Sequence, residues 1–320
     1  MTLLRRLLAG ETRALARAIS LVERGDPAGG ELVARVRAHT GKAAITGVTG
    51  PPGAGKSTLV GALVGELRTR DERVAVLSVD PTSPFTGGAL LGDRIRMVDH
   101  FLDDAVFIRS LASRGSVGGL AAAVRPAALL ADAAGYPHVL IETVGIGQAE
   151  VDIAGQADTT VVVLMPGAGD TLQAIKAGMM EIPDVLVVNK ADHPGADQLV
   201  RELKRTAALR ARPVPIVRTN ALTGDGVAEL ADVLAGRPRR RADDEQSSAG
   251  RRDATEREVV RLALDELRAR AERVLRDRDE GRAALAAVDE GRRAPEAAAR
   301  WVVAELTEPG LTEPGLTKPG

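Results

Sequence analysis

An α/β fold is predicted for this chain, with a mostly parallel sheet covered by helices on both faces. Between residues 41 and 236, short apolar runs alternate with helical stretches of ordinary crossover length, which is typical of parallel sheets. A glycine-rich loop follows the first of these runs, and a short polar motif follows a later one. Because both follow strands, we expect them at the carboxyl edge of the sheet, where ligands bind in this fold class.

Residues 1–40 are expected to form helices ahead of the sheet. Four aliphatic residues recur on one helical stripe, namely Leu4, Leu8, Leu15 and Ile19. Gly25-Asp26-Pro27 interrupts this pattern. A second short helix is expected over residues 30–39.

The strands are expected where apolar and β-branched residues form short runs. These runs are residues 43–49, 74–79, 105–109, 138–143, 159–165, 184–188 and 213–217. A helix is expected over residues 57–70, because its leucines and valine recur at helical spacing.

The glycine-rich loop matches the phosphate-loop pattern G-x-x-x-x-G-K-[ST] at every fixed position. It reads Gly50-Pro51-Pro52-Gly53-Ala54-Gly55-Lys56-Ser57-Thr58. Such a loop turns backbone N–H groups toward nucleotide phosphates, and the helix that follows adds its positive N-terminal end. Lys56 is expected to reach the outer phosphates and Ser57 to ligate Mg²⁺. A chance glycine-rich turn is the alternative, and the flanking strand and helix argue against it.

The second motif indicates a guanine nucleotide. Asn189-Lys190-Ala191-Asp192 follows an apolar strand and matches N-K-x-D. The Asp carboxylate can accept both the N1–H and the exocyclic amine of guanine, whereas adenine offers no such pair of donors. The Lys stem can pack along the base, and the Asn amide can tie the base edge to the phosphate loop. Asn220-Ala221-Leu222 follows the last strand, where a loop backbone can touch the guanine oxygen.

Composition argues against several other classes. The 320 residues include no cysteine, so neither disulfides nor thiolate metal sites are expected. The formal net charge of −1 gives no electrostatic reason to bind nucleic acid or membrane. No apolar run reaches the roughly 18 residues of a membrane span, and the start lacks the apolar core of a signal peptide. A cytoplasmic protein is therefore expected.

The chain beyond the α/β region divides into three parts. Residues 237–253 are charged and without apolar periodicity, so a linker is expected. Its Arg239-Arg240-Arg241 run is either a nucleic-acid patch or, in better accord with the acidic residues that follow, a solvated stretch. Residues 254–305 return to a helical pattern. Their apolar stripe, which could pack on the same chain or on a partner, consists of Val260, Leu264, Leu267, Ala271 and Val274. Residues 306–320 form a Pro- and Gly-containing pentapeptide repeat, expected to be disordered or extended.

Five further segments carry a family resemblance. They read Ser78-Val79-Asp80-Pro81-Thr82-Ser83-Pro84, Gly92-Asp93-Arg94-Ile95-Arg96-Met97, Arg114-Gly115-Ser116-Val117-Gly118-Gly119-Leu120, Glu142-Thr143-Val144-Gly145-Ile146-Gly147-Gln148 and Pro166-Gly167-Ala168-Gly169-Asp170. Together with the two nucleotide motifs, in this order, they resemble the MeaB/ArgK family of P-loop GTPases over roughly residues 1–236. The charged residues 237–253 and the repeat tail depart from the family pattern.

The resemblance implies a GTPase chaperone for an adenosylcobalamin-dependent acyl-CoA mutase, most often methylmalonyl-CoA mutase. It implies that the protein binds GTP and GDP with Mg²⁺, gates cobalamin delivery, and protects or rescues the mutase. A homodimer formed through the helical arm of residues 254–305 is implied, and an adenosyltransferase is a further candidate partner.

The acidic residues and one lysine have roles that the sequence leaves open. Asp80 ends a strand beside the phosphate loop, as a magnesium carboxylate should, or it caps a turn before Pro81. The resemblance places Asp93 and Glu142 near the metal and the γ-phosphate, although Asp93 could instead pair with a neighbouring arginine. No general base is evident, and Glu142 or a water network are both possible. The N–H of Gly145 is expected to sense the γ-phosphate.

Lys176 lies in a segment that the family uses as an additional switch, so it is a candidate catalytic or coupling residue. An ordinary solvated lysine is the alternative.

Two other functions are compatible with a phosphate loop. A nickel-type metallochaperone GTPase would need Cys or His clusters, but the four histidines are scattered. An ATPase or kinase tied to amino-acid transport would leave the guanine motif unexplained.

Overall fold

The structure is a computed structural model of the whole chain. It describes residues 2–80, 100, 102–112, 123–143, 153, 155–167, 182–207, 213–237, 259–260, 263–264, 267–268 and 270–307. The chain divides into two compact units, Met1–Asp243 and Asp244–Gly320.

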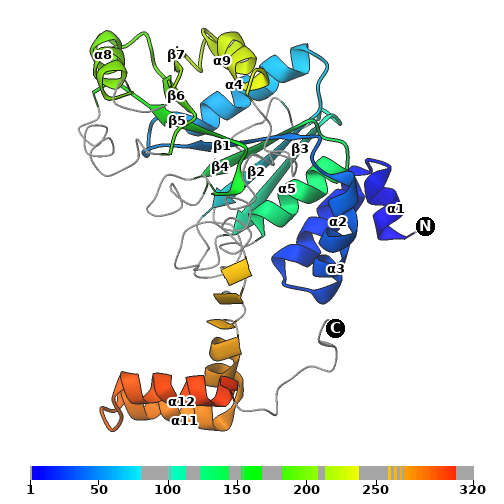
Figure 1. Cartoon of the computed structure of the whole chain (residues 1–320), viewed down its shortest axis with the longest axis vertical. Helices are drawn as coiled ribbons and strands as arrows, with labels where there is room; N and C mark the ends of the chain where they lie inside the picture. The colour runs from blue at the N-terminus through cyan, green and yellow to red at the C-terminus, as the bar shows by residue number, and fades with distance from the viewer. Residues whose placement is uncertain are drawn as a thin grey trace. The chain divides into compact units, whose positions relative to one another are not determined.

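The first unit is built on a seven-stranded sheet in the order β3-β2-β4-β1-β5-β6-β7 (Figure 1). All neighbouring strands are parallel. The strands are β1 (Ala44–Thr49), β2 (Val74–Asp80), β3 (Val106–Ala112), β4 (His138–Thr143), β5 (Thr159–Leu164), β6 (Val185–Val188) and β7 (Ile216–Arg218). The predicted α/β fold with a parallel sheet is confirmed. β1 lies between β4 and β5, so the loop after it emerges at the centre of the carboxyl edge.

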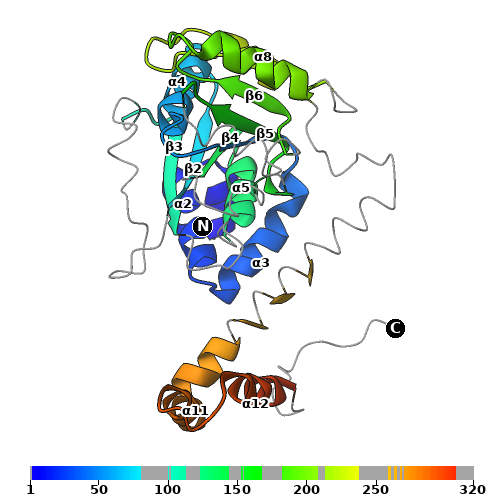
Figure 2. The same ribbon diagram turned by 90° about the vertical axis from the view of Figure 1, so that its left-hand side faces the viewer.

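Helices cover both faces because successive strand residues point in opposite directions. One face packs on α4 (Lys56–Thr69) and α9 (Val227–Ala235), through residues such as Val48 of β1. The other face packs on α5 (Val124–Ala133) and the N-terminal helices, through residues such as Ile45. On that same face, α8 (Ala196–Ala207) covers β5 and β6. Figure 2 shows α2 (Thr12–Glu23), α3 (Pro27–Val36) and α5 grouped together.

The N-terminal helices differ in detail from the prediction. The first helical run is broken at Gly10, whose φ of +78° separates α1 (Leu3–Leu8) from α2. The next helix starts at Pro27 rather than near residue 30, and it ends at Val36 before a short 3₁₀ turn. Asp26 caps it by accepting a hydrogen bond from the Ala28 N–H at 2.9 Å. An aspartate followed by proline at the first helical position is a strong signal for the start of a helix. The predicted start near residue 30 did not take this signal into account.

Most of the described residues of the second unit are helical. Residues 270–277 are followed by α11 (Asp279–Asp289) and α12 (Pro295–Thr307). α12 therefore extends over the first two residues assigned to the repeat tail. Among the described residues of the stripe, Val260, Leu264 and Leu267 are 50%, 61% and 49% exposed, whereas Val274 is buried.

Two predicted segments fall largely outside the description. Only Arg237 of the expected linker and Leu306 and Thr307 of the tail are described. Across the described part of the chain, every helix falls short of the length and hydropathy that crossing a bilayer requires.

Candidate functional site

A cavity of about 720 Å³ lies at the carboxyl edge of the sheet, over β1 and β6. The phosphate loop, Glu142, and the loops after β6 and β7 form its walls. The lining residues are Pro52, Gly53, Gly55, Lys56, Ser57, Thr58, Glu142, Asn189, Lys190, Asp192, His193, Pro194, Asn220, Ala221 and Leu222. The structure therefore brings the two predicted nucleotide motifs and the third loop to one place.

The phosphate loop depends on its glycines. Gly50 has a φ of +141°, and a Cβ there would lie 2.1 Å from the carbonyl oxygen of Val163. Gly55 has a φ of +87° and precedes the first residue of α4, Lys56. The Lys56 ammonium donates to the carbonyl oxygens of Gly50 at 2.8 Å and Pro51 at 3.1 Å. The lysine thus lies across the loop from which it would reach a phosphate.

The cavity has a predicted phosphate end, at the phosphate loop and Glu142, and a predicted base end, at Asp192, Asn220 and Leu222. Asn189 connects the two ends. Its Nδ2 donates to the carbonyl oxygen of Ala54 at 2.9 Å. Its Oδ1 accepts from the Thr219 hydroxyl and from the Ala221 N–H, both at 3.1 Å. A Cβ at Gly55 would lie 2.5 Å from the Asn189 Nδ2, so only glycine permits this approach. The carboxamide joins three loops and is buried among them.

The base end presents one carboxylate and one apolar side chain. Asp192 is exposed, and its Oδ1 accepts from the Asn220 Nδ2 at 3.2 Å. Leu222 is 88% exposed although it is a large aliphatic residue. The Leu222 N–H donates to the Asn220 Oδ1 at 3.1 Å. In this structure the N–H groups of Ala221 and Leu222 thus both have partners within the protein, so their predicted contact with a guanine oxygen stays a prediction.

Glu142 and Ser57 meet at the phosphate end. Glu142 is 2% exposed at the end of β4 and accepts a hydrogen bond from the Ser57 hydroxyl. Its second oxygen lies 3.5 Å from the Ser78 hydroxyl on β2. A hydroxyl and a carboxylate side by side are the hard oxygen donors that Mg²⁺ prefers, so these residues fit the predicted ion.

Four predicted site residues lie partly or wholly outside the described residues. Asp80 is the last residue of β2, but its side chain is not described. Asp93, Gly145 and Lys176 are not described at all. Their roles stay predictions from the sequence.

The sequence interpretation did not identify three residues near the site. His193 and Pro194 line the cavity, and Thr219 is fully buried beneath it. Thr219 directly precedes Asn220, so its place after the last strand was the available signal. His193 and Pro194 extend the N-K-x-D motif, but nothing in that motif requires them.

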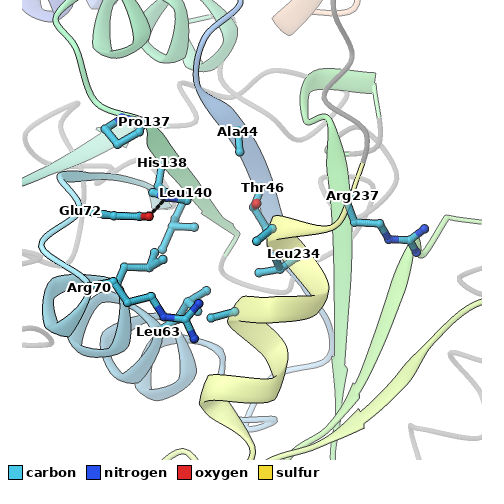
Figure 3. A pocket seen from close by; sticks show the side chains of 13 residues that line it. Ala44, Thr46, Leu63, Arg70, Glu72, Pro137, His138, Leu140, Leu234 and Arg237 are labelled. Carbon is cyan, nitrogen blue, oxygen red and sulfur yellow. Dashed lines mark hydrogen bonds and ion pairs between the residues drawn. The ribbon is translucent and has the colours of Figure 1, made fainter.

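A second, smaller cavity lies at the opposite edge of the sheet, between α4, α9 and the first residues of β1 and β4 (Figure 3). Its volume is about 170 Å³. His138 and Glu72 contact each other through a hydrogen bond at its border, and Arg70 bonds Asp232 at 2.7 Å. None of the predicted site residues lines this cavity. Within the described residues, no group of three or more His, Asp or Glu side chains could hold a metal ion.

A parallel sheet with a phosphate loop after β1 and an N-K-x-D motif after β6 defines the class of P-loop GTPases. The family model of the methylmalonyl-CoA mutase-associated GTPase MeaB matches residues 15–275. The chain belongs to this family, and it is a GTPase.

Known relatives agree with this assignment. A protein of Pyrococcus abyssi named as a GTPase is 50% identical over 240 residues, covering 72% of this chain and 74% of that protein. The GTPase ArgK of Escherichia coli is 44% identical over 193 residues, covering 59% of this chain and 58% of ArgK. A crystal structure titled LAO/AO transport system kinase has a TM-score of 0.61 at 29% identity, covering 96% of this chain and 97% of that chain.

Proposed function

We propose that this GTPase is a chaperone of an adenosylcobalamin-dependent acyl-CoA mutase, with methylmalonyl-CoA mutase as the first candidate. In this role it gates cofactor loading and protects or reactivates the mutase. The observation that carries the proposal is the family match, which covers residues 15–275 and so includes parts of both compact units. A relative in Caenorhabditis briggsae, named methylmalonic aciduria type A homolog, supports the same direction at 39% identity over 205 residues.

We assign the site residues as follows. Lys56 stabilises the charge of the transferring phosphoryl group, and Asp192 reads the guanine edge. Ser57 and Glu142 would hold Mg²⁺, with Asp80 and Asp93 as further predicted ligands. When bound, the ion neutralises charge on the phosphates. Glu142 is also a candidate for orienting the attacking water, and Lys176 for carrying the partner's signal.

Hydrolysis by the isolated chain is expected to be slow. Among the described residues that line the cavity, the cationic side chains are Lys56 and Lys190, and there is no arginine. An arginine supplied to the transition state accelerates related GTPases by several decades. A partner-controlled rate is therefore the expected behaviour.

The test measures GTP turnover alone and with each candidate mutase, namely the methylmalonyl-, isobutyryl- and ethylmalonyl-CoA enzymes. One of them should raise the rate by about tenfold or more, and K56A with the same mutase should show no such rise. In parallel, the rate at which the mutase loses activity during turnover is measured. This rate should fall only when the cognate mutase is mixed with this GTPase and GTP. Fast turnover by the isolated protein, at about 10 per second, would contradict partner control, as would indifference to all three mutases.

Assembly and location complete the proposal. We propose a homodimer formed through the second unit, supported by its exposed stripe of Val260, Leu264 and Leu267. An adenosyltransferase as a further partner and a cytoplasmic location stay predictions from the sequence.

A transport-linked kinase or ATPase is the second candidate, because a structural relative carries that title. The Asp192 carboxylate argues against it, since adenine cannot satisfy this group with paired donors. Calorimetry with ATP and GTP separates the two: equal affinities would favour the kinase or ATPase.

A further inference from the structure

The smaller cavity at the amino edge of the sheet, which we call the α4–α9 cavity, is large for a space inside a folded unit. Protein interiors contain few voids larger than a water molecule, whereas this cavity measures about 170 Å³. Figure 3 shows Leu63 of α4, Leu140 of β4 and Leu234 of α9 around it. A cavity of about 150 Å³ with aliphatic walls can hold a benzene molecule. The space therefore suits a small organic molecule.

One buried polar side chain, that of Thr46, belongs to the lining. Thr46 is 5% exposed, and Figure 3 shows its side chain extending from β1 toward Leu234. Within the part of the chain that the structure describes, its hydroxyl has no hydrogen-bond partner. A buried hydroxyl without a partner destabilises a fold. A molecule that bonds this hydroxyl would therefore be stabilised there.

The charged groups at the border of the cavity are largely paired with one another. Arg70 bonds Glu66 at 2.8 Å and Asp232 at 2.7 Å, and so joins α4 to α9. Glu72 is bonded to His138. Because a charged ligand would lose its hydration without gaining an unpaired counter-ion from these groups, the border favours an uncharged one.

Arg237 is the remaining charged residue among those that line the cavity. Its Nε is buried without a protein partner. Figure 3 shows the guanidinium directed away from Thr46, beyond the end of α9. It is therefore poorly placed to pair with a ligand seated at Thr46.

Water would fill this space poorly. At about 30 Å³ for each molecule the cavity has room for about five waters, and a buried water typically makes about three hydrogen bonds. The aliphatic side chains of the walls offer none, and the buried Thr46 hydroxyl can bond one or two waters.

We propose that the α4–α9 cavity is a binding site for a small uncharged molecule, with an apolar body about as large as benzene and one hydroxyl or carbonyl group that bonds Thr46. The site is separate from the nucleotide cavity, because no described residue lines both. The two helices that border it nevertheless begin next to the nucleotide site. α4 starts at Lys56 of the phosphate loop, and α9 starts at Val227, after the loop that carries Leu222.

The test uses the full chain saturated with GDP, so that the nucleotide cavity is occupied. Phenol and toluene are titrated by NMR, because they have nearly the same shape and differ by a hydroxyl in place of a methyl group. Both should bind wild type, and phenol should bind with a dissociation constant below about 1 mM. Thr46→Val keeps the shape of the side chain and removes its hydroxyl. It should weaken phenol about 3- to 10-fold and leave toluene unchanged or bound more tightly.

Two further variants locate the site. Thr160→Val is the matched control, because Thr160 is a buried threonine of β5 that pairs with Gly47 and so faces the other side of the sheet. It should leave both affinities unchanged. Ala231→Leu places a branched side chain in the cavity from α9, so it should weaken both probes at least about tenfold. If this variant does not fold, the ratio of the two affinities in Thr46→Val still decides.

Absence of binding to wild type at about 10 mM of either probe would mean that the cavity holds only water, and would overturn the inference. An unchanged ratio of the two affinities in Thr46→Val would overturn the role of Thr46. Loss of phenol binding on saturation with GDP would place the probe in the nucleotide cavity instead. Benzoate carries a charge on the same ring and should bind at least about tenfold more weakly than phenol. Tighter binding of benzoate would contradict an uncharged ligand.

Discussion

At the scale of single residues, Asn189 shows why the phosphate and base ends act as one site. Both ends of its side-chain amide form hydrogen bonds with other residues of the protein. Its role is therefore to hold the loops together. It fixes the distance between the phosphate loop and the loops after β6 and β7, which are predicted to read the base. The missing Cβ of Gly55 is the matching feature on the phosphate loop.

Asp192 is expected to decide which base is bound. In Asp192→Asn, an amide donor replaces one acceptor oxygen, so affinity for GTP should fall by about tenfold or more. Xanthosine triphosphate should bind better to the variant than to wild type, because its 2-oxo group can accept from the new donor. Competition binding with both nucleotides checks this exchange. An unchanged ratio of the two affinities would contradict guanine recognition by Asp192.

Leu222 is expected to lie against a face of the base. A leucine 88% exposed at the tip of a held loop gains from being covered by a flat apolar ligand. Leu222→Ala should weaken GDP and inosine diphosphate (IDP) equally, by about 5- to 30-fold if about 1 to 2 kcal/mol of burial is lost. Leu102→Ala is the control, because Leu102 is 92% exposed and does not line the cavity. A change in the GDP to IDP ratio with Leu222→Ala would contradict an apolar platform.

Lys56 is expected to be essential for turnover. Removing a preorganised positive charge from the transition state typically costs 10²- to 10³-fold in rate. Lys56→Ala should therefore lose hydrolysis by about that factor in single-turnover assays. A variant with wild-type turnover would mean that the phosphate loop is not the active site.

Contiguous motifs could be predicted from the sequence, whereas contacts between loops could not. The phosphate loop and N-K-x-D each carry their chemistry within nine residues or fewer, so pattern and flanking strands sufficed. The bonds of Thr219 and Asn220 depend on where β6 and β7 end relative to each other. That register is set by packing of the whole sheet, which no local pattern encodes.

At the scale of elements, the sheet was predictable because buried parallel strands read as apolar runs. The ends of the strands were predicted less accurately than their existence. The last expected strand, residues 213–217, is observed as Ile216–Arg218. How the helical N-terminal segment attaches to the sheet was not predicted, since it depends on a long-range contact. Asp132, near the end of α5, accepts hydrogen bonds from the backbone N–H groups of Gly41, Lys42 and Ala43.

Asp132 is therefore expected to be a stabilising residue outside the nucleotide site. It is 4% exposed, and its loss would leave up to three N–H groups without protein partners. Asp132→Ala should lower the free energy of unfolding by about 2–4 kcal/mol. Glu31→Ala, at an exposed pair with Arg35, should cost less than about 0.5 kcal/mol.

The two units can be followed separately in urea. The single tyrosine, Tyr136, lies in the first unit, and the single tryptophan, Trp301, lies in the second. Asp132→Ala should lower the urea concentration at the midpoint of the transition that tyrosine fluorescence reports. The midpoint of the transition that tryptophan fluorescence reports should stay unchanged. An unshifted tyrosine transition would mean that water replaces the carboxylate at little cost.

At the scale of the whole molecule, the sequence predicted five segments, with a charged linker of residues 237–253 between the GTPase region and the helical arm. The structure divides the chain into two compact units, Met1–Asp243 and Asp244–Gly320, and the finer division stays a prediction. The sequence also predicted an apolar stripe on the helical arm. The structure distinguishes the members of the stripe, because Val274 is buried whereas Val260, Leu264 and Leu267 are exposed. Composition and periodicity identify an amphipathic helix but do not say which of its residues find partners in the same chain.

The exposed stripe is expected to hold two copies together. Burying the exposed half of Val260, Leu264 and Leu267 should contribute about 2–5 kcal/mol per chain before ordering costs, since full burial of such a side chain contributes about 1.5–3 kcal/mol. A two-fold arrangement would present the same stripe from both chains. Light scattering should therefore report a dimer for the full chain and a monomer for a chain ending at residue 250. The shortened chain should still bind GTP, because every described residue that lines the nucleotide cavity lies in the first unit.

A point substitution separates the stripe from other effects of truncation. Leu264→Glu in the full chain introduces a charge at a residue 61% exposed, so it should dissociate the dimer without unfolding the helix. Leu102→Glu, at a leucine 92% exposed in the first unit, should leave the dimer intact. If the chain ending at residue 250 stays dimeric, the interface lies in the first unit. In that case the three exposed side chains would be free to meet a different partner, and the mutase would be the first to test against Leu264→Glu.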